Sequence, residues 1–195
     1  MKLSERFQEG FELAFELHAS QERKGSKVPY MGHLLGVAAI VIDDGGTENE
    51  AIAALLHDGP EDQGGLATLE RIRQEFGDEV ADIVKALSDT FEEKKPEWKQ
   101  RKIDYLEELS KTPDDDLGAK ILRVSLADKV YNVRAIAFDY GSEGEKVWDR
   151  FNGSKEDSLW YYRSLGEVYS EKLGADEPLV KAYLRDEANL RSLGQ

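Results

Sequence analysis

The 195-residue chain contains no cysteine. Disulfide bonds, thiolate nucleophiles, zinc ribbons and iron–sulfur clusters are therefore excluded, because each of them needs cysteine sulfur. Any metal ion must be held by nitrogen and oxygen atoms. Histidine is also scarce, with three residues in the whole chain, so the surroundings of each one can be weighed individually.

Basic residues are few relative to acidic ones. The chain has 26 Lys and Arg against 40 Asp and Glu, and its net charge is −14. Nucleic-acid binding draws much of its affinity from basic side chains that neutralise phosphates. We therefore expect no nucleic-acid partner.

Long apolar runs are missing as well. No stretch approaches the roughly 20 apolar residues of a membrane span, and the charged start MKLSERFQEG is unlike a signal peptide. The sequence therefore predicts a cytoplasmic protein with no membrane partner.

What the sequence does contain is a succession of helical patterns. Phe7, Phe11 and Phe15 follow one another at intervals of four, which is typical of one face of a helix. Thr47 and Glu50 form a capping box that opens the apolar segment AIAALLHD. No segment alternates between apolar and polar residues as an exposed strand does, so the sequence predicts an all-α protein.

We expect these helices to form one compact multi-helix bundle. The predicted domain occupies residues 1–195, with a core over about 7–140 and C-terminal helices over about 154–193. The charged segment Glu92–Lys102 is predicted to be a mobile insertion, which forms either a lid or, as we favour, a solvated helix.

Acidic residues stand at two positions where a helix does not favour them. Asp58 follows His57 at the predicted end of a helix, where the negative end of the dipole repels a carboxylate. Asp128 lies in the apolar stretch of a long predicted helix, and a buried aspartate must be paired, hydrogen-bonded or metal-bound. A helix-capping role for His57 and an ion pair of Asp128 with Lys129 or Arg134 remain the simpler alternatives.

Two imidazoles and two carboxylates can be combined into one donor set, His33, His57, Asp58 and Asp128. Such a set suits a divalent ion such as Mn²⁺, Fe²⁺ or Zn²⁺. A divalent ion can activate water and polarise a phosphoryl oxygen. The sequence therefore indicates metal-assisted hydrolysis.

Several segments around these residues resemble one enzyme family. They are HASQERKG, YMGHLLGVAAI, AALLHDGPED, IRQEFGDEVADIV and GAKILRVSLADKVYNVR. The chain resembles the HD-domain phosphohydrolases and, more closely, the hydrolase half of the RelA/SpoT alarmone enzymes, especially the small alarmone hydrolases such as the metazoan SpoT homologues. The resemblance covers roughly residues 7–140.

This resemblance implies an HD-domain bundle that acts as a guanosine-3′,5′-bis(diphosphate) 3′-pyrophosphohydrolase. Its partner would be a small guanine nucleotide, and the oligomeric state is left open. The resemblance assigns Mn²⁺ binding to His33, His57, Asp58 and Asp128. It assigns the activation of water to Glu61 and Asp62. It also assigns phosphate contacts to Arg23 and Lys24 and a nucleoside contact to Asn132. We expect Lys129 and Arg134 to line the cleft as further cations, which would offset the acidic net charge.

One departure from the family pattern affects the expected substrate. Ser125 stands where many members have Lys, which removes a positive charge near the site. The first of two alternatives rests on this change, and the second is a rival from a different class of protein. One is an HD phosphatase that acts on the 2′-phosphate of NADPH or on a nucleoside monophosphate, and the other is a module that binds an alarmone without cleaving it.

Overall fold

The computed structural model describes residues 1–88 and 97–194. Over these residues the helices are α1 (Glu5–His18), α2 (Met31–Asp43), α3 (Glu48–Leu56), α4 (Gly59–Asp62), α5 (Gly65–Phe76), α6 (Asp78–Leu87), α7 (Trp98–Ser110), α8 (Asp116–Glu143), η1 (Gly144–Arg150), α9 (Lys155–Tyr169), η2 (Ser170–Gly174) and α10 (Pro178–Ser192). No strand forms in the described ranges, which confirms the all-α prediction. None of the helices in these ranges is long and apolar enough to cross a membrane.

The helix starts follow signals in the sequence. The Thr47 hydroxyl accepts a hydrogen bond from the backbone N–H of Glu50, and the Glu50 carboxylate accepts one from Thr47, so the capping box is formed as predicted. Ser154 caps α9 through the backbone N–H of Asp157.

A proline and a glycine mark two further helix boundaries. Pro60 occupies the first turn of the short helix α4, where its missing N–H is not needed. Helix α8 continues through Gly141 and ends at Gly144, whose positive φ of 60° is readily adopted by glycine. In the predicted insertion, residues 92–96 lie outside the described part of the chain, and residues 98–102 form the first turns of α7.

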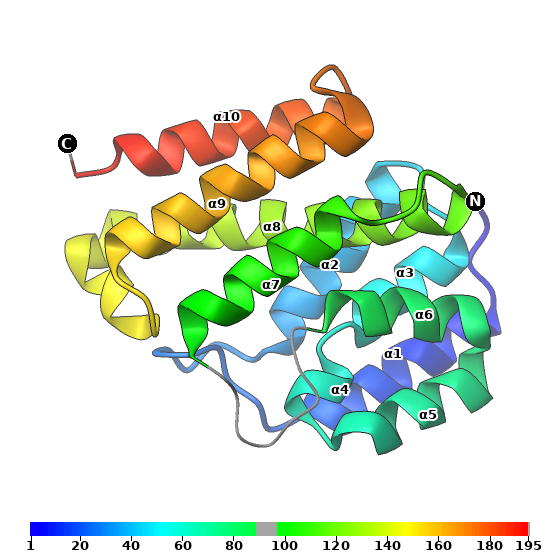
Figure 1. Cartoon of the computed structure of the whole chain (residues 1–195). Helices are drawn as coiled ribbons and strands as arrows, with labels where there is room; N and C mark the ends of the chain where they lie inside the picture. The colour runs from blue at the N-terminus through cyan, green and yellow to red at the C-terminus, as the bar shows by residue number, and fades with distance from the viewer. Residues whose placement is uncertain (89–96, 195) are drawn as a thin grey trace.

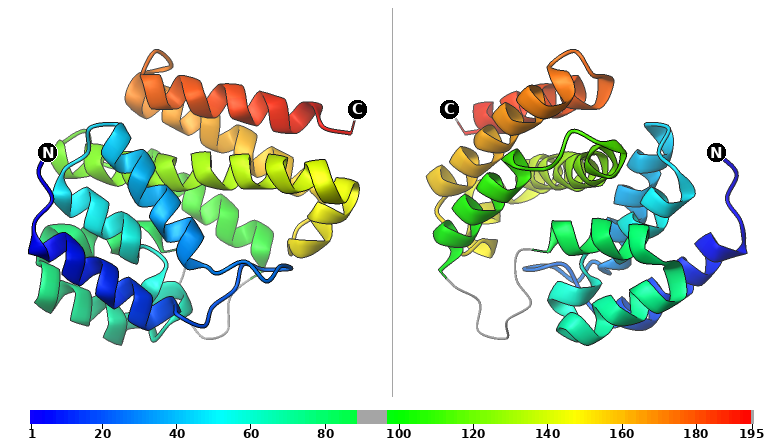
Figure 2. Two further views of the ribbon diagram at one scale, coloured as in Figure 1. Left: turned by 180° about the vertical axis from the view of Figure 1, so that it is seen from behind. Right: turned by 45° about the vertical axis from the view of Figure 1, so that its right-hand side comes forward.

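The long helix α8 joins two groups of helices. Figures 1 and 2 show α9 and α10 on one side of α8, with α2, α3 and α6 on the other. Val124 and Ala127 of α8 belong to the core cluster shared with the N-terminal helices. Leu126, Val130 and Val133 belong to the cluster shared with α9 and α10. Because α8 is apolar on both faces, Asp128 is carried into the middle of the molecule.

Candidate metal centre

His57 and Asp58 lie at the junction between α3 and α4. Every residue from Ala51 to Leu56 is fully buried, so the end of α3 is inside the protein. His57 is 2% exposed. The chain then turns at Asp58, whose side chain is 23% exposed. His57 is the C-cap residue of α3, so the helix-capping alternative is present, and it coexists with the contacts that the ring makes with side chains of two other helices.

His33 comes from α2 and Asp128 from α8, and both reach this junction. His33 Nε2 lies 3.3 Å from His57 Nε2, 3.3 Å from Asp58 Oδ2 and 3.4 Å from Asp128 Oδ1. His57 Nε2 lies 2.9 Å from Asp58 Oδ2 and 3.8 Å from Asp128 Oδ1. The structure thus brings all four predicted ligands together, although His33, His57 and Asp58 form the tightest group.

A hydrogen bond of His57 determines what these atoms can do. Its Nδ1 lies 2.8 Å from the carbonyl oxygen of Ala54, and a carbonyl can only accept, so Nδ1 carries the hydrogen. In a neutral imidazole, Nε2 then presents a lone pair to Asp58. Lone pairs of nitrogen and carboxylate oxygen this close together repel unless a cation or a proton lies between them. Metal-binding histidines commonly donate their second nitrogen to a backbone carbonyl in this way.

The pKa shifts of His57 and Asp58 also indicate that this cluster favours a positive charge between its donor atoms. Burial lowers the pKa of His57, but the attraction of Asp58 and then of Asp128 outweighs it and raises the pKa to about 9. Burial raises the pKa of Asp58, yet the two imidazoles overcome it and hold that pKa well below its usual range. The donor chemistry therefore fits a divalent cation, which would replace the protons that the cluster otherwise attracts.

Neighbouring side chains fix the two carboxylates. The Tyr30 hydroxyl donates to Asp58 Oδ2 at 2.7 Å. Asn132 Nδ2 donates to Asp128 Oδ1 and Lys129 Nζ to Asp128 Oδ2, each at 2.6 Å. The predicted pairing of Asp128 with Lys129 is therefore present, and it coexists with the convergence of Asp128 on the histidines.

A pocket of about 250 Å³ opens beside the cluster. Its lining includes Lys24, Tyr30, His33, Asp58, Glu61, Leu87, Trp98, Arg101, Lys102, Asp128, Lys129, Asn132, Arg150, Phe151 and Asn152. Glu61 therefore faces the same space as three of the candidate ligands. A carboxylate in this position can orient or deprotonate a water molecule next to a bound substrate.

Asp62 is held differently from Glu61. It is exposed, does not belong to the pocket lining, and its Oδ2 accepts a hydrogen bond of 2.8 Å from Gln21 Nε2. The side-chain oxygen Oε1 of Gln21 is in turn 2.7 Å from His18 Nδ1, and it accepts a hydrogen bond from Gln63 Nε2 at 2.9 Å. These contacts orient the Gln21 amide so that its N–H points to Asp62.

The predicted substrate cations occupy separate places. Lys24 lines the pocket and donates to Asn152 at 2.6 Å. Arg23 stacks over Tyr131, 5.3 Å from the ring centre. Arg134 pairs with Asp186 of α10 at 2.6 Å and does not belong to the lining of this pocket.

Sequence reasoning missed three cations of the pocket, Arg101, Lys102 and Arg150. Arg101 is 9% exposed, and its Nη1 lies 3.9 Å from Glu61 Oε1. Arg101 and Lys102 lie in the charged segment that the sequence analysis assigned to a solvated helix. Their helical interval from Trp98, an apolar residue in the same segment, was the signal that they could share its inward face.

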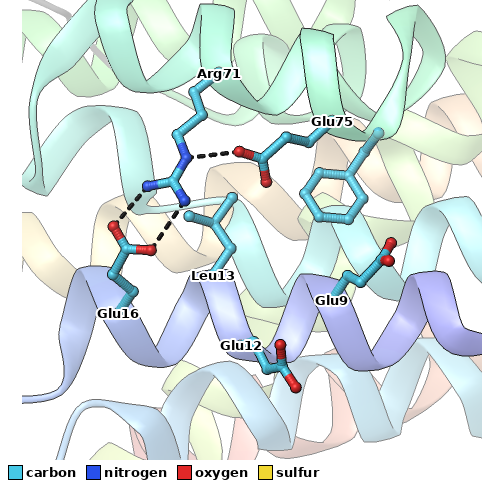
Figure 3. Close-up of a pocket in the computed structure, with 7 residues that line it drawn as sticks. Glu9, Glu12, Leu13, Glu16, Arg71 and Glu75 are labelled. Carbon is cyan, nitrogen blue, oxygen red and sulfur yellow. Dashed lines mark hydrogen bonds and ion pairs between the residues drawn. The ribbon is translucent and has the colours of Figure 1, made fainter.

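A second pocket, between α1 and α5, has different chemistry. Figure 3 shows Arg71 held by Glu16, at 2.6 and 2.9 Å, and by Glu75 at 2.7 Å. The other polar lining residues of this pocket are Glu9 and Glu12. With its single arginine paired and no histidine in its lining, this pocket lacks the groups that bind a phosphorylated substrate.

Comparison with known proteins identifies the family of the chain. The family described as HD domain matches residues 10–156. The guanosine-3′,5′-bis(diphosphate) 3′-pyrophosphohydrolase MESH1 of Xenopus tropicalis is 39% identical over 129 residues, which cover 65% of this chain and 66% of the relative. The Homo sapiens protein of the same name is 33% identical, with the same coverage of 65% and 66%. The chain thus spans slightly less than two thirds of the length of these relatives.

Two solved structures share the fold. That of a metazoan ortholog of SpoT that hydrolyses ppGpp has a TM-score of 0.73 at 23% identity and covers 99% of each chain. That of a Listeria monocytogenes protein has a TM-score of 0.65 at 29% identity and covers 80% of this chain and 96% of the other. The arrangement of helices predicted from the resemblance is therefore confirmed.

Proposed function

The chain belongs to the HD-domain family, and on that premise we propose that it is a metal-dependent guanosine-3′,5′-bis(diphosphate) 3′-pyrophosphohydrolase. It would convert the tetraphosphate to GDP and its pentaphosphate relative to GTP, with release of pyrophosphate. The observation that carries the proposal is the convergence of His33, His57, Asp58 and Asp128 beside a pocket that also contains Glu61. We propose a cytoplasmic location, because the substrate is a nucleotide of the cell interior.

We propose Mn²⁺ as the resident ion, with Fe²⁺ or Zn²⁺ as substitutes. The two imidazoles suit borderline metals and the two carboxylates suit harder ones, a combination that favours Mn²⁺ and Fe²⁺. When bound, the ion supplies Lewis-acid activation of water and of a phosphoryl oxygen.

The reaction transfers the pyrophosphoryl group from the ribose 3′ oxygen to water. The oxygen of water bonds to the phosphorus attached to the ribose 3′ oxygen, the bond between that phosphorus and the 3′ oxygen breaks, and the 3′ oxygen gains a proton. Glu61 would accept the proton of the water, a role supported by its position in the pocket lining. Asp62, held by Gln21, would assist in orienting the water.

The pocket also supplies positive charge for the substrate. Lys24, Arg101, Lys102 and Arg150 line it, although the whole molecule is strongly acidic. These cations can stabilise the charge that develops on the phosphoryl oxygens during transfer. We further propose that Asn132 contacts the nucleoside and that Arg23 approaches the phosphates, while Arg134 acts from the rim of the site.

The test is incubation of the purified protein with guanosine 3′,5′-bis(diphosphate), with and without Mn²⁺, followed by ³¹P NMR of the products. We expect pyrophosphate and GDP in the presence of Mn²⁺ and no reaction after chelation. Orthophosphate as the product, or phosphate release from NADPH or a nucleoside monophosphate alone, would assign the site to another HD phosphatase. Binding of the nucleotide without turnover would leave a sensing module.

A further inference from the structure

Lys129 is largely but not fully buried next to a candidate metal ligand. Its side chain is 13% exposed, and its Nζ lies 2.6 Å from Asp128 Oδ2. The same ammonium stands over the ring of Tyr105, 5.2 Å from the ring centre. The contact with the Asp128 carboxylate and the face of the Tyr105 ring together stabilise the charged ammonium inside the protein.

A chain of buried hydroxyls holds the surface on which this ammonium rests. Ser125 Oγ lies 2.8 Å from the Tyr105 hydroxyl and 2.7 Å from the Tyr169 hydroxyl. Tyr105, Ser125 and Tyr169 are 4%, 0% and 0% exposed and come from α7, α8 and α9. The hydroxyl chain thus fixes the orientation of the Tyr105 ring, whose face attracts a cation.

The two oxygens of Asp128 consequently have different surroundings. Oδ1 faces the His33 imidazole at 3.4 Å and accepts from Asn132. Oδ2 is turned away from the cluster toward Lys129. Both hydrogen-bond donors come from α8 itself, one residue and one turn further along, so α8 alone sets the rotation of this carboxylate.

We propose that Lys129 is a positioning residue that occupies Asp128 Oδ2, restricts Asp128 to binding the metal through Oδ1, and retains one positive charge beside the metal for an anionic substrate. The last part rests on the proposed function. Lys129 then competes with the metal for the charge of Asp128. Compared with a protein that lacks the Lys129 charge, metal binding is therefore weaker and binding of the anionic substrate is stronger.

The test is to measure Mn²⁺ affinity of the metal-free protein in the absence of nucleotide for wild type, Lys129→Met and Lys129→Gln. Gln keeps a hydrogen-bond donor for Asp128 Oδ2 and removes the charge, and Met removes both. We expect both variants to bind Mn²⁺ about tenfold more tightly, because a positive charge near the ligand carboxylate is gone. In turnover assays we expect the KM for the nucleotide to rise about tenfold in Lys129→Gln, with a smaller change in kcat.

Lys120→Met is the matched control. Lys120 is on the same helix, is also 13% exposed, and is paired with Glu79 and Asp116, which are not candidate ligands. The Mn²⁺ affinity and the KM of the Lys120→Met variant should equal those of wild type. Because Gln preserves the hydrogen bond, Lys129→Gln keeps the test usable if Lys129→Met does not fold.

The opposite directions of the two effects separate this role from a merely structural one. Unchanged or weaker Mn²⁺ binding by a folded Lys129→Gln variant would overturn the proposal, because structural damage lowers metal affinity. Failure of the proposed function is a different result: the wild type would bind Mn²⁺ but release no pyrophosphate. The metal titration would still decide the role of Lys129.

Discussion

Individual hydrogen bonds orient the polar side chains of the candidate metal centre. The Nδ1 hydrogen of His57 is committed to Ala54, which directs the Nε2 lone pair toward Asp58. Asp58 is further oriented by the hydroxyl of Tyr30. Burial raises the pKa of this tyrosine, and the adjacent Asp58 carboxylate raises it further, so Tyr30 is a hydrogen-bond donor at all physiological pH values.

Substitution of Asp62 tests whether this residue takes part in the reaction. A general base contributes about 100-fold to 10,000-fold to the rate, and because Asp62 would orient the water for Glu61, we expect Asp62→Asn to lower kcat by up to that factor, with bound metal unchanged. The measurements are pyrophosphate release and metal content by mass spectrometry. Asp43→Asn, at an exposed position at the end of α2, is the control. Undiminished turnover in Asp62→Asn would remove Asp62 from the mechanism.

A carboxylate away from the site predicts how stability depends on pH. Glu187 of α10 is 4% exposed, and burial raises its pKa above the ordinary value of 4.5, although Arg191 opposes this shift. A raised folded pKa means that ionisation disfavours the fold. The free energy of unfolding of wild type relative to Glu187→Gln should therefore fall as the pH rises from 4.5 through the folded pKa. Denaturant unfolding at a series of pH values measures it.

Glu79 provides a comparison of opposite sign. Its hydrogen bond with Lys120 holds the pKa of Glu79 below 4.5. Its stabilising contribution is present above pH 4.5 and is lost as the pH falls through the folded pKa. The difference in free energy of unfolding between wild type and Glu79→Gln should therefore decrease on acidification. Parallel pH dependences for the two variants would contradict the assignment of Glu187.

At the scale of elements, the close approach of α2 and α8 sets the position of His33. Gly36 of α2 faces Tyr131 of α8, and a Cβ at position 36 would lie 2.0 Å from Tyr131 Cε2. The Tyr131 ring also packs edge-on against the His33 imidazole, with 5.0 Å between ring centres. The absence of a side chain at Gly36 therefore lets α8 support His33, a candidate metal ligand carried by α2.

Gly36→Ala should disturb both packing and the site. We expect it to lower the free energy of unfolding by about 1–3 kcal/mol through overpacking and to weaken Mn²⁺ binding as Tyr131 displaces His33. Thermal unfolding and metal titration measure the two effects. Gly32→Ala, on the same helix with open space around the added Cβ, should be neutral or stabilising by up to about 1 kcal/mol. Equal behaviour of the two variants would contradict this role of Gly36.

At the scale of the whole molecule, the candidate metal centre lies where the two helical groups meet. His33, His57 and Asp58 come from the N-terminal helices and their junctions, and Asp128 comes from α8. The pocket is closed on its other side by α7 and η1, which supply Arg101 and Arg150. A bound ion would therefore connect segments that are far apart in the sequence.

Metal binding should consequently stabilise the fold. With Mn²⁺ at about 100 times its Kd, the free energy of unfolding should rise by about 2.7 kcal/mol, which raises Tm by several degrees. Chelation should reverse the change. In Asp58→Asn, which lacks one ligand charge, Mn²⁺ should leave Tm nearly unchanged. An equal Mn²⁺ effect on this variant and on wild type would place the binding site elsewhere.

The sequence by itself determined the class of fold and the candidate ligands. Helical spacing and caps such as Thr47 depend on neighbouring residues, so they can be recognised without tertiary structure. The ligand prediction rested on residue types in unfavourable places, an aspartate at a helix end and another in an apolar stretch. These positions need compensation in any fold, which is why Asp58 and Asp128 could be singled out.

Only the tertiary structure decided which cations face the site. Lys129 lines the pocket, but its ammonium lies over Tyr105, which is distant in sequence, and pairs with Asp128. Arg134 lies on the same helix as Asp128, yet it pairs with Asp186 of α10. The direction of a long charged side chain depends on which elements pack around it, and those contacts form between residues that no local pattern connects.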